Sequence, residues 1–538
     1  MSDRTGRFAI AVACGAFLAL SLPHLDRLPP IHNDEPTILA PGLKLFTHGV
    51  FGLDMLDGLA GADRHYLEVM PAMSVLEGAV ARLAGTGVWQ MRVVPVALGV
   101  ATMALAGVLA LRLAGPTTAA LTVGLLLLWK WTPGRGEFLP SGIPLVDVSR
   151  IARYDILAAP LGLAALLAFF SARARGSPSL CLLAGGCVGA ATLATPYAAF
   201  WGAALLILLP LDVRWSPAAA RHGWRDAGLV AGAATAFVLP WVLFALLHWG
   251  ELQGQFARHA GRFALASPAF YAGSLLHEIE RYELGLRSPA TFTRIGFWLL
   301  VVGVPAALVW LARHANATRD RHALWLLIPC VAQPALLALL VNVKRFYYLI
   351  SVVPLFAVVL AWGFTALLGA PRRVVRVAAA AVLVLAAAEG AVAIVRMHEA
   401  AARCSPPAGF LVRLRGAVGP AAQRILGPHP YWFAVPGRDY LSFTVPVSIM
   451  AAEHGSLGDA LTTAAPDTVL LTPYLIDVYT HLRFGPGPAT VGELHTLLGT
   501  LGFVETGELT DNTGKQVEVW QARVPIRAPA EAHHSTQP

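Results

Sequence analysis

Long apolar runs limit what this chain can fold into more than any other feature. A membrane-spanning helix needs about 20 mostly apolar residues, and scanning the sequence with that rule predicts about eleven spans. Only 13% of the 538 residues are charged and 56% are hydrophobic, whereas soluble proteins carry about 25% charged residues. We therefore expect a mainly α-helical, polytopic transmembrane bundle, and the net charge of +8 gives no reason to expect a nucleic-acid partner. The predicted spans are 8–23, 92–113, 117–131, 155–170, 179–195, 198–211, 227–247, 294–312, 322–341, 345–369 and 374–393.

Arginines in the short connections predict the orientation of the bundle. If the N-terminus, with Arg4 and Arg7, lies in the cytoplasm, every predicted cytoplasmic connection contains arginine. This alternation follows the positive-inside rule and supports both the number of spans and their direction. Three external segments, 24–91, 132–154 and 248–293, are too long for simple connections, and long loops in compact proteins usually carry function. The cytoplasmic arginines are Arg112, Arg173, Arg175, Arg214, Arg221, Arg225, Arg313, Arg319, Arg321, Arg372, Arg373 and Arg376.

The composition changes after residue 393, where polar residues and turn residues become as frequent as in a soluble protein. We expect a transmembrane domain over 1–397, with 24–91 as its first external loop, and a small extracytoplasmic α/β domain over 398–538. Alternating apolar residues predict strands there, and an amphipathic stretch that ends in glycine predicts a helix. The strands are expected at 467–475, 503–509 and 515–524, and the helix at 491–502.

An acidic cluster follows the first span, with His32, Asp34 and Glu35 close to the expected membrane exit. Adjacent carboxylates are costly to remove from water, so they are kept near a membrane mainly where they bind or react. Pro36 prevents the apolar helix from simply continuing. The alternative is a solvated loop or a helix N-cap, because Asn33 or Asp34 before Pro36 is a good capping pattern.

A second cluster in the same loop holds His65, Tyr66 and Glu68 before Pro71. The apolar stretch 71–85 that follows is typical of a helix lying at the membrane interface. Such a helix could help to shape a groove that faces lipid.

A third cluster precedes the fourth span. Arg150 and Arg153 are three residues apart, so on a helix they share a face, and Asp155 begins the span. Guanidinium groups match phosphate oxygens in a fork geometry, which favours a phosphate site. The alternative is an internal Arg–Asp pair that holds two helices together.

A fourth cluster, with Lys344, Arg345, Tyr347 and Tyr348, lies in a very short external connection. Cations on this side break the positive-inside pattern, which favours an anion held at the membrane surface. The alternative is that the basic side chains reach lipid headgroups within an aromatic belt.

All four clusters are predicted on the same external face, with carboxylates and cations at the membrane boundary. This arrangement suits a phosphate-bearing lipid whose head is attacked by an acceptor that a carboxylate activates. The five cysteines show no metal-binding spacing, so we expect neither a zinc site nor a disulfide framework.

In these motifs the chain resembles the GT-C superfamily of glycosyltransferases, in the branch of protein O-mannosyltransferases and lipid A aminoarabinose transferases. The shared features occur in the same order over roughly residues 8–393. They are the Asp34–Glu35 pair, a glycine-turn segment at 47–52, Tyr66 with Glu68 and Pro71, Arg150 with Arg153 and Asp155, and the basic-aromatic segment 344–354.

The resemblance implies a polyprenyl-phosphate-linked sugar as donor, an extracytoplasmic acceptor, and an inverting single displacement without a covalent enzyme intermediate. It implies a multi-pass protein of a bacterial-type inner membrane. It also implies no cofactor, although His32, Asp34 and Glu35 are ligand types that Mg²⁺ or Mn²⁺ can use. Catalytic roles then fall to Asp34 as general base or acceptor-orienting carboxylate, Glu35 as its support and Glu68 as an acceptor-side acid. The donor phosphate is expected at Lys344, Arg345, Tyr347, Arg150 and Arg153, with His32, His65, Tyr66 and Asp155 in supporting positions.

The acceptor and two other function classes stay open. The aminoarabinose branch usually has a lysine and two prolines after the acidic residue, whereas Val69, Met70 and Pro71 follow Glu68 here, so a glycolipid, a polysaccharide and a protein all remain candidate acceptors. A transporter or flippase of a lipid-linked sugar would bind the same lipid without catalysis, but the sequence lacks an inverted repeat and a matching pair of broken helices. A structural membrane scaffold would leave the external charged clusters unexplained.

Overall fold

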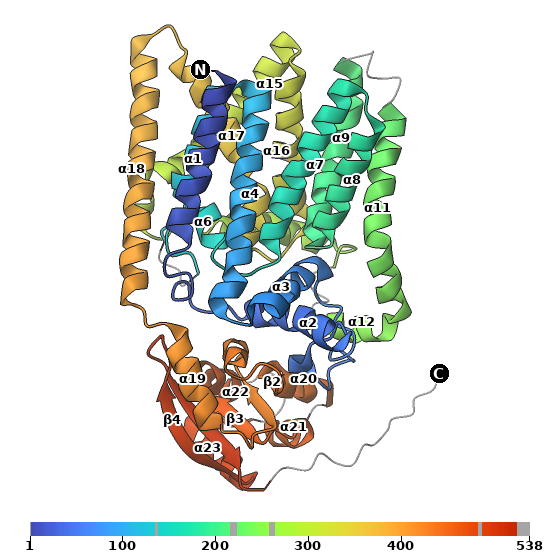
Figure 1. Cartoon of the computed structure of the whole chain (residues 1–538), viewed down its shortest axis with the longest axis vertical. Helices are drawn as coiled ribbons and strands as arrows, with labels where there is room; N and C mark the ends of the chain where they lie inside the picture. Colours follow the sequence, from blue (N-terminus) through green and yellow to red (C-terminus); the bar gives the residue numbers. More distant parts are fainter. Residues whose placement is uncertain are drawn as a thin grey trace.

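The computed structural model describes residues 2–134, 138–215, 223–257, 264–453, 455–481 and 487–524. A bundle of long helices carries the N-terminus at one end and a small α/β domain at the other (Figure 1). Within the described residues, eight helices are long and apolar enough to cross a membrane, and three shorter apolar helices lie among them. Each predicted span coincides with one of these helices, so the predicted fold class is confirmed. The helices are α1 (Asp3–Ser21), α4 (Val88–Ala114), α5 (Pro116–Leu128), α7 (Asp155–Arg175), α8 (Pro178–Thr192), α9 (Ala199–Trp215), α11 (Gly223–Leu247), α14 to α15 (Ile295–Trp298 and Val304–Thr318, joined by the π-helical turn Leu299–Gly303), α16 (Arg321–Leu340), α17 (Val353–Leu368) and α18 (Arg373–Arg403).

Exposed apolar side chains identify the outer surface of the bundle as the surface that faces lipid. In the most apolar stretch of α7, 78% of the residues are buried, whereas in α11 only 6% are buried. Helix α11 exposes Phe237, Leu243 and Leu247. In water, each such side chain would forgo about 1.5–3 kcal/mol of burial free energy. Lipid removes that cost, so this surface fits a multi-pass membrane protein.

The N-terminus and the short connections after α4, α7, α15 and α17 gather at one end of the bundle (Figure 1). These are the arginine-bearing connections of the sequence analysis; Arg221, in the connection between α9 and α11, lies outside the described residues. The long connections gather at the opposite end, beside the α/β domain. All four charged clusters therefore lie toward this second end.

The first long connection forms two helices, α2 (Asp34–His48) and α3 (Pro71–Ala84), which lie across the end of the bundle, above the α/β domain (Figure 1). Their backbones nearly touch, because a Cβ atom added at Gly42 would lie 1.7 Å from the Ser74 carbonyl oxygen. A Cβ atom at Gly78 would lie 2.2 Å from the Gly42 carbonyl carbon. The two glycines thus fix where α2 crosses α3, and this crossing positions the start of α2.

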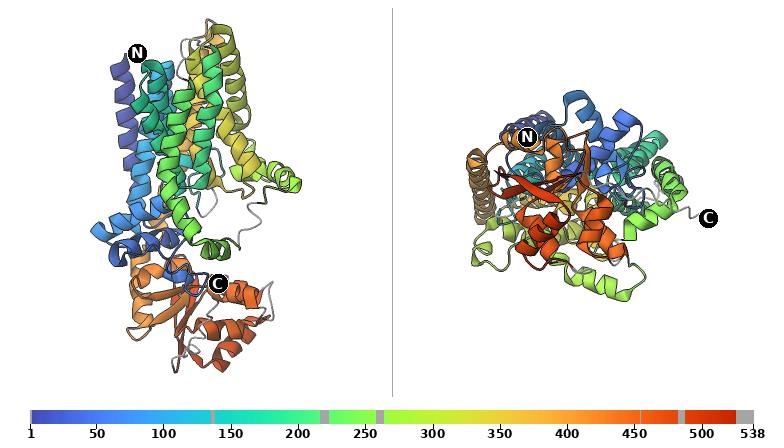
Figure 2. Two further views of the ribbon diagram at one scale, coloured as in Figure 1. Left: turned by 90° about the vertical axis from the view of Figure 1, so that its right-hand side faces the viewer. Right: turned by 90° about the horizontal axis from the view of Figure 1, so that it is seen from below.

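The C-terminal domain is built on a mixed sheet that has five strands in the described part of the chain, in the order β2-β1-β3-β5-β4. Strand β1 pairs in parallel with β2 and β3, while β5 pairs antiparallel with β3 and β4. The left view of Figure 2 shows this domain below the end of the bundle, and the right view, seen from below, shows it in front of the bundle. The predicted strands at 503–509 and 515–524 and the predicted helix match β4, β5 and α23. The strand predicted at 467–475 matches β3 only up to Leu471, because helix α22 begins at Pro473, and β1 and β2 were not predicted. The strands are β1 (Arg424–Gly427), β2 (Asp439–Ser442), β3 (Thr468–Leu471), β4 (Phe503–Thr510) and β5 (Gln516–Ala522), and the helices are α19 (Pro407–Val418), α20 (Thr444–Glu453), α21 (Leu457–Ala464), α22 (Pro473–Thr480) and α23 (Val491–Thr500).

Polar contacts hold the C-terminal domain against the first long connection. Arg424 at the start of β1 pairs with Asp57 of that connection at 2.8 Å and with Asp439 of β2 at 3.0 Å. His429, just after β1, donates from Nδ1 to the carbonyl oxygen of Asn33 at 3.1 Å. The carboxyl ends of β1 and β2 therefore face the start of α2.

Candidate functional site at the end of the bundle

A cavity of about 620 Å³ lies where α2, the long connections of the bundle and the C-terminal domain meet. Small-molecule sites in proteins typically enclose about 300–1,000 Å³. The predicted site residues that line it are His32, Asp34, Tyr66, Glu68, Arg153, Arg345 and Tyr347. Glu35, His65, Arg150, Asp155 and Lys344 do not line it. The cavity thus brings together at least one member of each of the four charged clusters.

Asp34 is the first residue of α2, and its carboxylate forms an ion pair with the Arg153 guanidinium. The Asp34 side chain remains 40% exposed because it faces the cavity, whereas Arg153 is only 4% exposed. Burial raises the pKa of Asp34, but the charge of Arg153 outweighs it and holds the pKa below its usual value. Asp34 is therefore an anion at neutral pH.

Arg153 lies between two carboxylates and an aromatic ring. Its Nε donates to Asp155 Oδ2 at 3.0 Å, on the side away from the cavity. Its guanidinium carbon lies 4.2 Å from the centre of the Tyr347 ring, a distance at which a cation–π contact is favourable. Because Arg153 is held by Asp155 and Tyr347 as well as by Asp34, its position does not depend on Asp34 alone.

Arg345 contributes a second cation to the cavity, and Tyr347 follows it two residues later. Glu283 lies near Arg345; burial raises the pKa of Glu283, and the charge of Arg345 opposes this shift. The ring of His32 packs edge-on against Tyr347, with 5.6 Å between the ring centres. Burial lowers the pKa of His32, so its imidazole is neutral at neutral pH.

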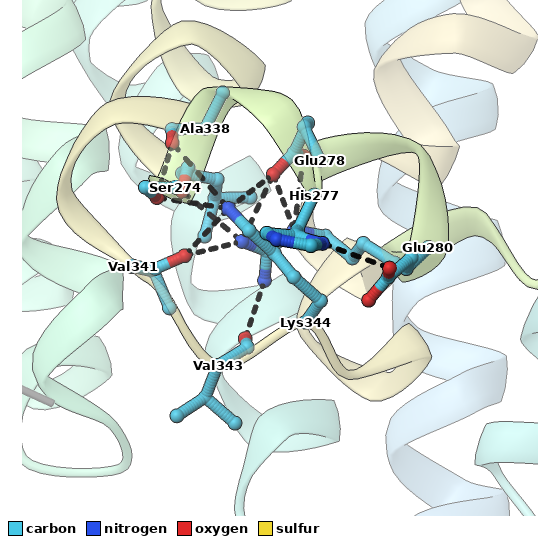
Figure 3. A network of polar contacts seen from close by, with 10 residues as sticks. Ser274, His277, Glu278, Glu280, Ala338, Val341, Val343 and Lys344 are labelled. Atoms are coloured by element: carbon cyan, nitrogen blue, oxygen red, sulfur yellow. Dashed lines mark hydrogen bonds and ion pairs between the residues drawn. The ribbon is translucent and has the colours of Figure 1, made fainter. Parts of the chain in front are cut away.

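Lys344 does not line the cavity and belongs to a polar network of its own (Figure 3). Its Nζ donates to Glu278 Oε2 at 2.7 Å, to Ser274 Oγ at 2.9 Å and to the Val341 carbonyl oxygen at 2.8 Å. The fully buried Arg281 also binds Glu278 and donates to the Val341 carbonyl oxygen. Two cations thus satisfy the carbonyl groups at the end of α16, and they fix the connection that carries Arg345.

Glu35 is fully buried beside its neighbour Asp34 and forms a bidentate pair with Arg92 of α4. Arg92 donates to Glu35 Oε1 from Nε at 2.8 Å and to Oε2 from Nη2 at 2.7 Å. The backbone amides of His32 and Ala152 complete the pair at 2.7 Å and 2.9 Å. Glu35 therefore ties α2 to α4 and to the segment that carries Arg153.

Arg150 has a comparable structural environment. It is fully buried and donates to backbone carbonyl oxygens of the segment that leaves α1, among them Ser21 at 2.5 Å and Leu28 at 2.8 Å. Of the two arginines in its cluster, only Arg153 reaches the cavity.

His65 binds outside the cavity, where its Nδ1 lies 2.8 Å from Glu251 Oε2. The next residues, Tyr66 and Glu68, line the cavity. Gln255 of α12 (Trp249–Ala257) holds this segment, because it accepts from the Leu67 amide at 2.8 Å and donates to the His65 carbonyl oxygen at 2.7 Å. The segment is thus fixed by a helix from the long connection 248–293.

Several cavity residues were not predicted from the sequence. His429 and Thr444 come from the C-terminal domain, and Tyr197 and Glu283 come from connections of the bundle. The Thr195–Pro196 break in the apolar run before α9 was the one available signal for Tyr197. The sequence around His429 and Thr444 reads as an ordinary soluble domain and gives no such signal.

No protein-family model and no curated protein matches this sequence. Solved structures, in contrast, resemble it over most of its length. ArnT from Cupriavidus metallidurans bound to undecaprenyl phosphate matches with a TM-score of 0.56 and 14% identity over 95% of this chain and 97% of that chain. The same protein in the apo state matches with a TM-score of 0.58 and 14% identity over 96% and 98%. The Archaeoglobus fulgidus oligosaccharyltransferase in complex with Zn and sulfate matches with a TM-score of 0.58 and 13% identity over 95% of this chain and 72% of that chain.

Both of these proteins are GT-C glycosyltransferases. This chain has the GT-C fold. The GT-C fold covers the bundle and the C-terminal domain together, because the match to ArnT spans nearly the full length of both chains.

On this GT-C scaffold, the three residues with metal-ligand chemistry point to different partners. Asp34 pairs with Arg153, Glu35 is held by Arg92, and His32 Nδ1 accepts from the Asp34 amide at 3.1 Å. In the part of the chain that the structure describes, no three His, Cys, Asp or Glu side chains are placed so that they could hold a metal ion. Each of the two carboxylates is thus paired with an arginine.

Proposed function

We propose that this protein is an inverting glycosyltransferase that moves a sugar from a polyprenyl-phosphate donor to an extracytoplasmic acceptor. The observation that supports this most is the single cavity that combines the Asp34 carboxylate with the Arg153 and Arg345 cations. A phosphate leaving group needs positive charge, and an acceptor hydroxyl needs a carboxylate nearby. The GT-C fold of ArnT bound to undecaprenyl phosphate supports the lipid-linked donor.

The donor phosphate lies, in this proposal, between Arg345, Tyr347 and Arg153. Arg345 is exposed to the cavity, so its guanidinium can reach phosphate oxygens there. Arg153 already has Asp155 and Tyr347 as partners, so it can turn part of its guanidinium toward the phosphate. The lipid chain then extends toward the bilayer along the bundle.

Transfer proceeds in one displacement. The acceptor oxygen attacks the anomeric carbon, the bond from that carbon to the phosphate oxygen breaks, and polyprenyl phosphate leaves with the electron pair. The proton of the acceptor hydroxyl goes to Asp34. Phosphate that draws Arg153 away from Asp34 raises the pKa of Asp34, because burial then acts without the opposing charge, and Asp34 becomes a stronger base when the donor is bound.

The arginine-bearing end of the bundle is assigned to the cytoplasm by the positive-inside rule. The C-terminal domain lies at the opposite end of the bundle (Figure 1), and its residues help to line the cavity. In this proposal both therefore face the outside of a bacterial-type inner membrane. A donor made on a polyprenyl lipid reaches this cavity from the outer leaflet.

Asp34→Asn tests the proposal in protein reconstituted into lipid nanodiscs. We expect transfer from undecaprenyl-phosphate-linked sugars, measured as released undecaprenyl phosphate, to fall at least 100-fold, since a positioned base typically contributes about 10²–10⁴-fold. Asp54→Asn is the matched control, because Asp54 lies in the same connection and pairs with Lys44 at the surface. Release that survives Asp34→Asn at the wild-type rate refutes the catalytic role of Asp34.

The arginine partners of Asp34 and Glu35 also support a reaction that needs no divalent metal. We expect the rate to be unchanged by EDTA. A loss of activity that Mn²⁺ or Mg²⁺ restores would contradict this part of the proposal.

A further inference from the structure

The C-terminal domain closes the cavity on the side away from the bundle. Strands β1 and β2 run in parallel, and segments that follow the carboxyl ends of parallel strands lie at the same edge of a sheet, where open sheets commonly bind ligands. His429 follows β1, and Thr444 follows β2. Both residues line the cavity that contains Asp34.

A chain of hydrogen bonds joins these residues to α2. Thr444 Oγ1 lies 2.7 Å from Ser442 Oγ, which lies 2.6 Å from His429 Nε2. His429 Nδ1 lies 3.1 Å from the carbonyl oxygen of Asn33, the residue before Asp34. Ser442 is fully buried, so protein atoms fix the middle of the chain.

The direction of each hydrogen bond follows from its chemistry. A carbonyl oxygen can only accept, so His429 Nδ1 carries the hydrogen, and in the neutral imidazole Nε2 accepts from the Ser442 hydroxyl. The Ser442 oxygen then accepts both from the Thr444 amide, at 3.0 Å, and from the Thr444 hydroxyl. With this neutral imidazole, the Thr444 hydroxyl donates to Ser442, and no hydrogen bond to its oxygen is found from another described residue, so the oxygen can accept from a ligand in the cavity.

The position of Thr444 in the cavity indicates which substrate it meets. The donor phosphate and its lipid belong on the bundle side, where Arg153 and Arg345 lie. An in-line displacement requires the acceptor oxygen to approach from the side opposite the leaving phosphate. The wall formed by the C-terminal domain lies away from the bundle, so a substrate that comes from outside the bilayer meets it first.

We propose that Thr444, held by Ser442 and His429, binds a hydroxyl group of the acceptor and orients it toward Asp34. This inference rests on the proposed function and adds the acceptor side of the site: the acceptor is a polyhydroxylated group with at least one hydroxyl besides the one that reacts. Thr444 is a specificity-determining residue, and His429 is a positioning residue that ties it to the start of α2.

The test uses full-length protein in nanodiscs with an undecaprenyl-phosphate-linked hexose and two acceptors, n-octyl β-D-glucoside and water. Thr444→Val keeps the shape of the side chain and removes the hydroxyl. We expect KM for octyl glucoside to rise roughly 2- to 13-fold, which corresponds to one lost hydrogen bond of about 0.5–1.5 kcal/mol, and release to water to stay unchanged. Thr444→Ser should restore KM, and Thr462→Val, at an exposed helical threonine of the same domain, should leave both rates unchanged.

The outcomes separate this inference from the proposed function. Equal slowing of transfer to both acceptors, or an unchanged KM for octyl glucoside in Thr444→Val, overturns the role of Thr444 while the proposed function stands. If wild-type protein releases no undecaprenyl phosphate with either acceptor, the proposed function fails and the inference fails with it.

Discussion

The adjacent carboxylates Asp34 and Glu35 should respond to mutation in opposite ways, because one faces the cavity and the other is fully buried. In Glu35→Gln an amide nitrogen replaces one carboxylate oxygen. Each of these oxygens accepts two hydrogen bonds, one from Arg92 and one from a backbone amide. Two buried donors therefore lose their acceptor, and Arg92, which is fully buried, loses its counter-charge.

The size of the effect can be worked from this geometry. Each buried donor left without an acceptor costs about 1–3 kcal/mol, and breaking a buried ion pair by removing one partner costs about 3–5 kcal/mol. We expect Glu35→Gln to lower the free energy of unfolding by about 3–5 kcal/mol. Natural proteins have only about 5–15 kcal/mol in total, so the loss should be large enough to measure.

Thermal unfolding in detergent, followed by loss of the monodisperse peak, is the assay. Glu35→Gln should unfold at a clearly lower temperature than wild type. Asp34→Asn should lose much less stability, because Arg153 keeps Asp155 as a partner, and should lack activity. Wild-type stability for Glu35→Gln, or equal destabilisation by both changes, would refute the assignment of the two carboxylates.

Three further predictions follow from the same contacts. Arg345→Gln should weaken binding of undecaprenyl phosphate roughly 10-fold or more, as expected for the loss of about 1.5–3 kcal/mol from a charged hydrogen bond. Lys344→Met should instead lower thermal stability, because it leaves Glu278 with one cation fewer. The reverse pattern would contradict the geometry. Arg153→Met should move the acid limb of the pH–rate profile to higher pH, because burial then raises the pKa of Asp34 without the opposing charge of Arg153. In wild type the folded pKa is depressed, so the stability from this pair is present above the ordinary Asp pKa of about 4 and is lost only as the pH falls through the lower folded value. An unshifted limb in Arg153→Met would argue against the pair. Gly42→Ala should destabilise the protein by about 1–3 kcal/mol, as overpacking does, because the added Cβ atom meets the Ser74 carbonyl oxygen. Gly15→Ala is the control, because nothing lies within 4 Å of a Cβ atom added there. Equal unfolding temperatures for the two variants would show that α2 and α3 do not cross at Gly42.

The membrane bundle could be predicted from sequence because lipid imposes a simple requirement on composition and length. Apolar runs long enough to span a bilayer stand out in a single sequence, and the arginine alternation orders them. Strands β1 and β2 carry no comparable signal. They are as short as β3, with four residues each, but they lie outside the apolar run that predicts β3, and their pairing depends on partners distant in the chain.

The site could be predicted to the level of clusters but not to the level of single residues. In three clusters one member reaches the cavity and its neighbour is structural: Asp34 and Glu35, Arg153 and Arg150, Arg345 and Lys344. Each structural member is chosen by a partner far along the chain. Arg92 binds Glu35, the carbonyl oxygens that follow α1 bind Arg150, and Glu278 binds Lys344. Local sequence does not contain these partners, so it cannot decide which neighbour faces the cavity.

The position of the bound lipid phosphate tests the central claim most directly. Undecaprenyl phosphate with a photoreactive group next to the phosphate can be crosslinked to the wild-type protein, and the labelled peptides can be mapped by mass spectrometry. The labels should fall on segments around residues 32–37, 153–154 and 345–348 and should decrease when unlabelled undecaprenyl phosphate competes. Labels confined to the arginine-bearing end of the bundle, or to the outer face of α18, would contradict the claim.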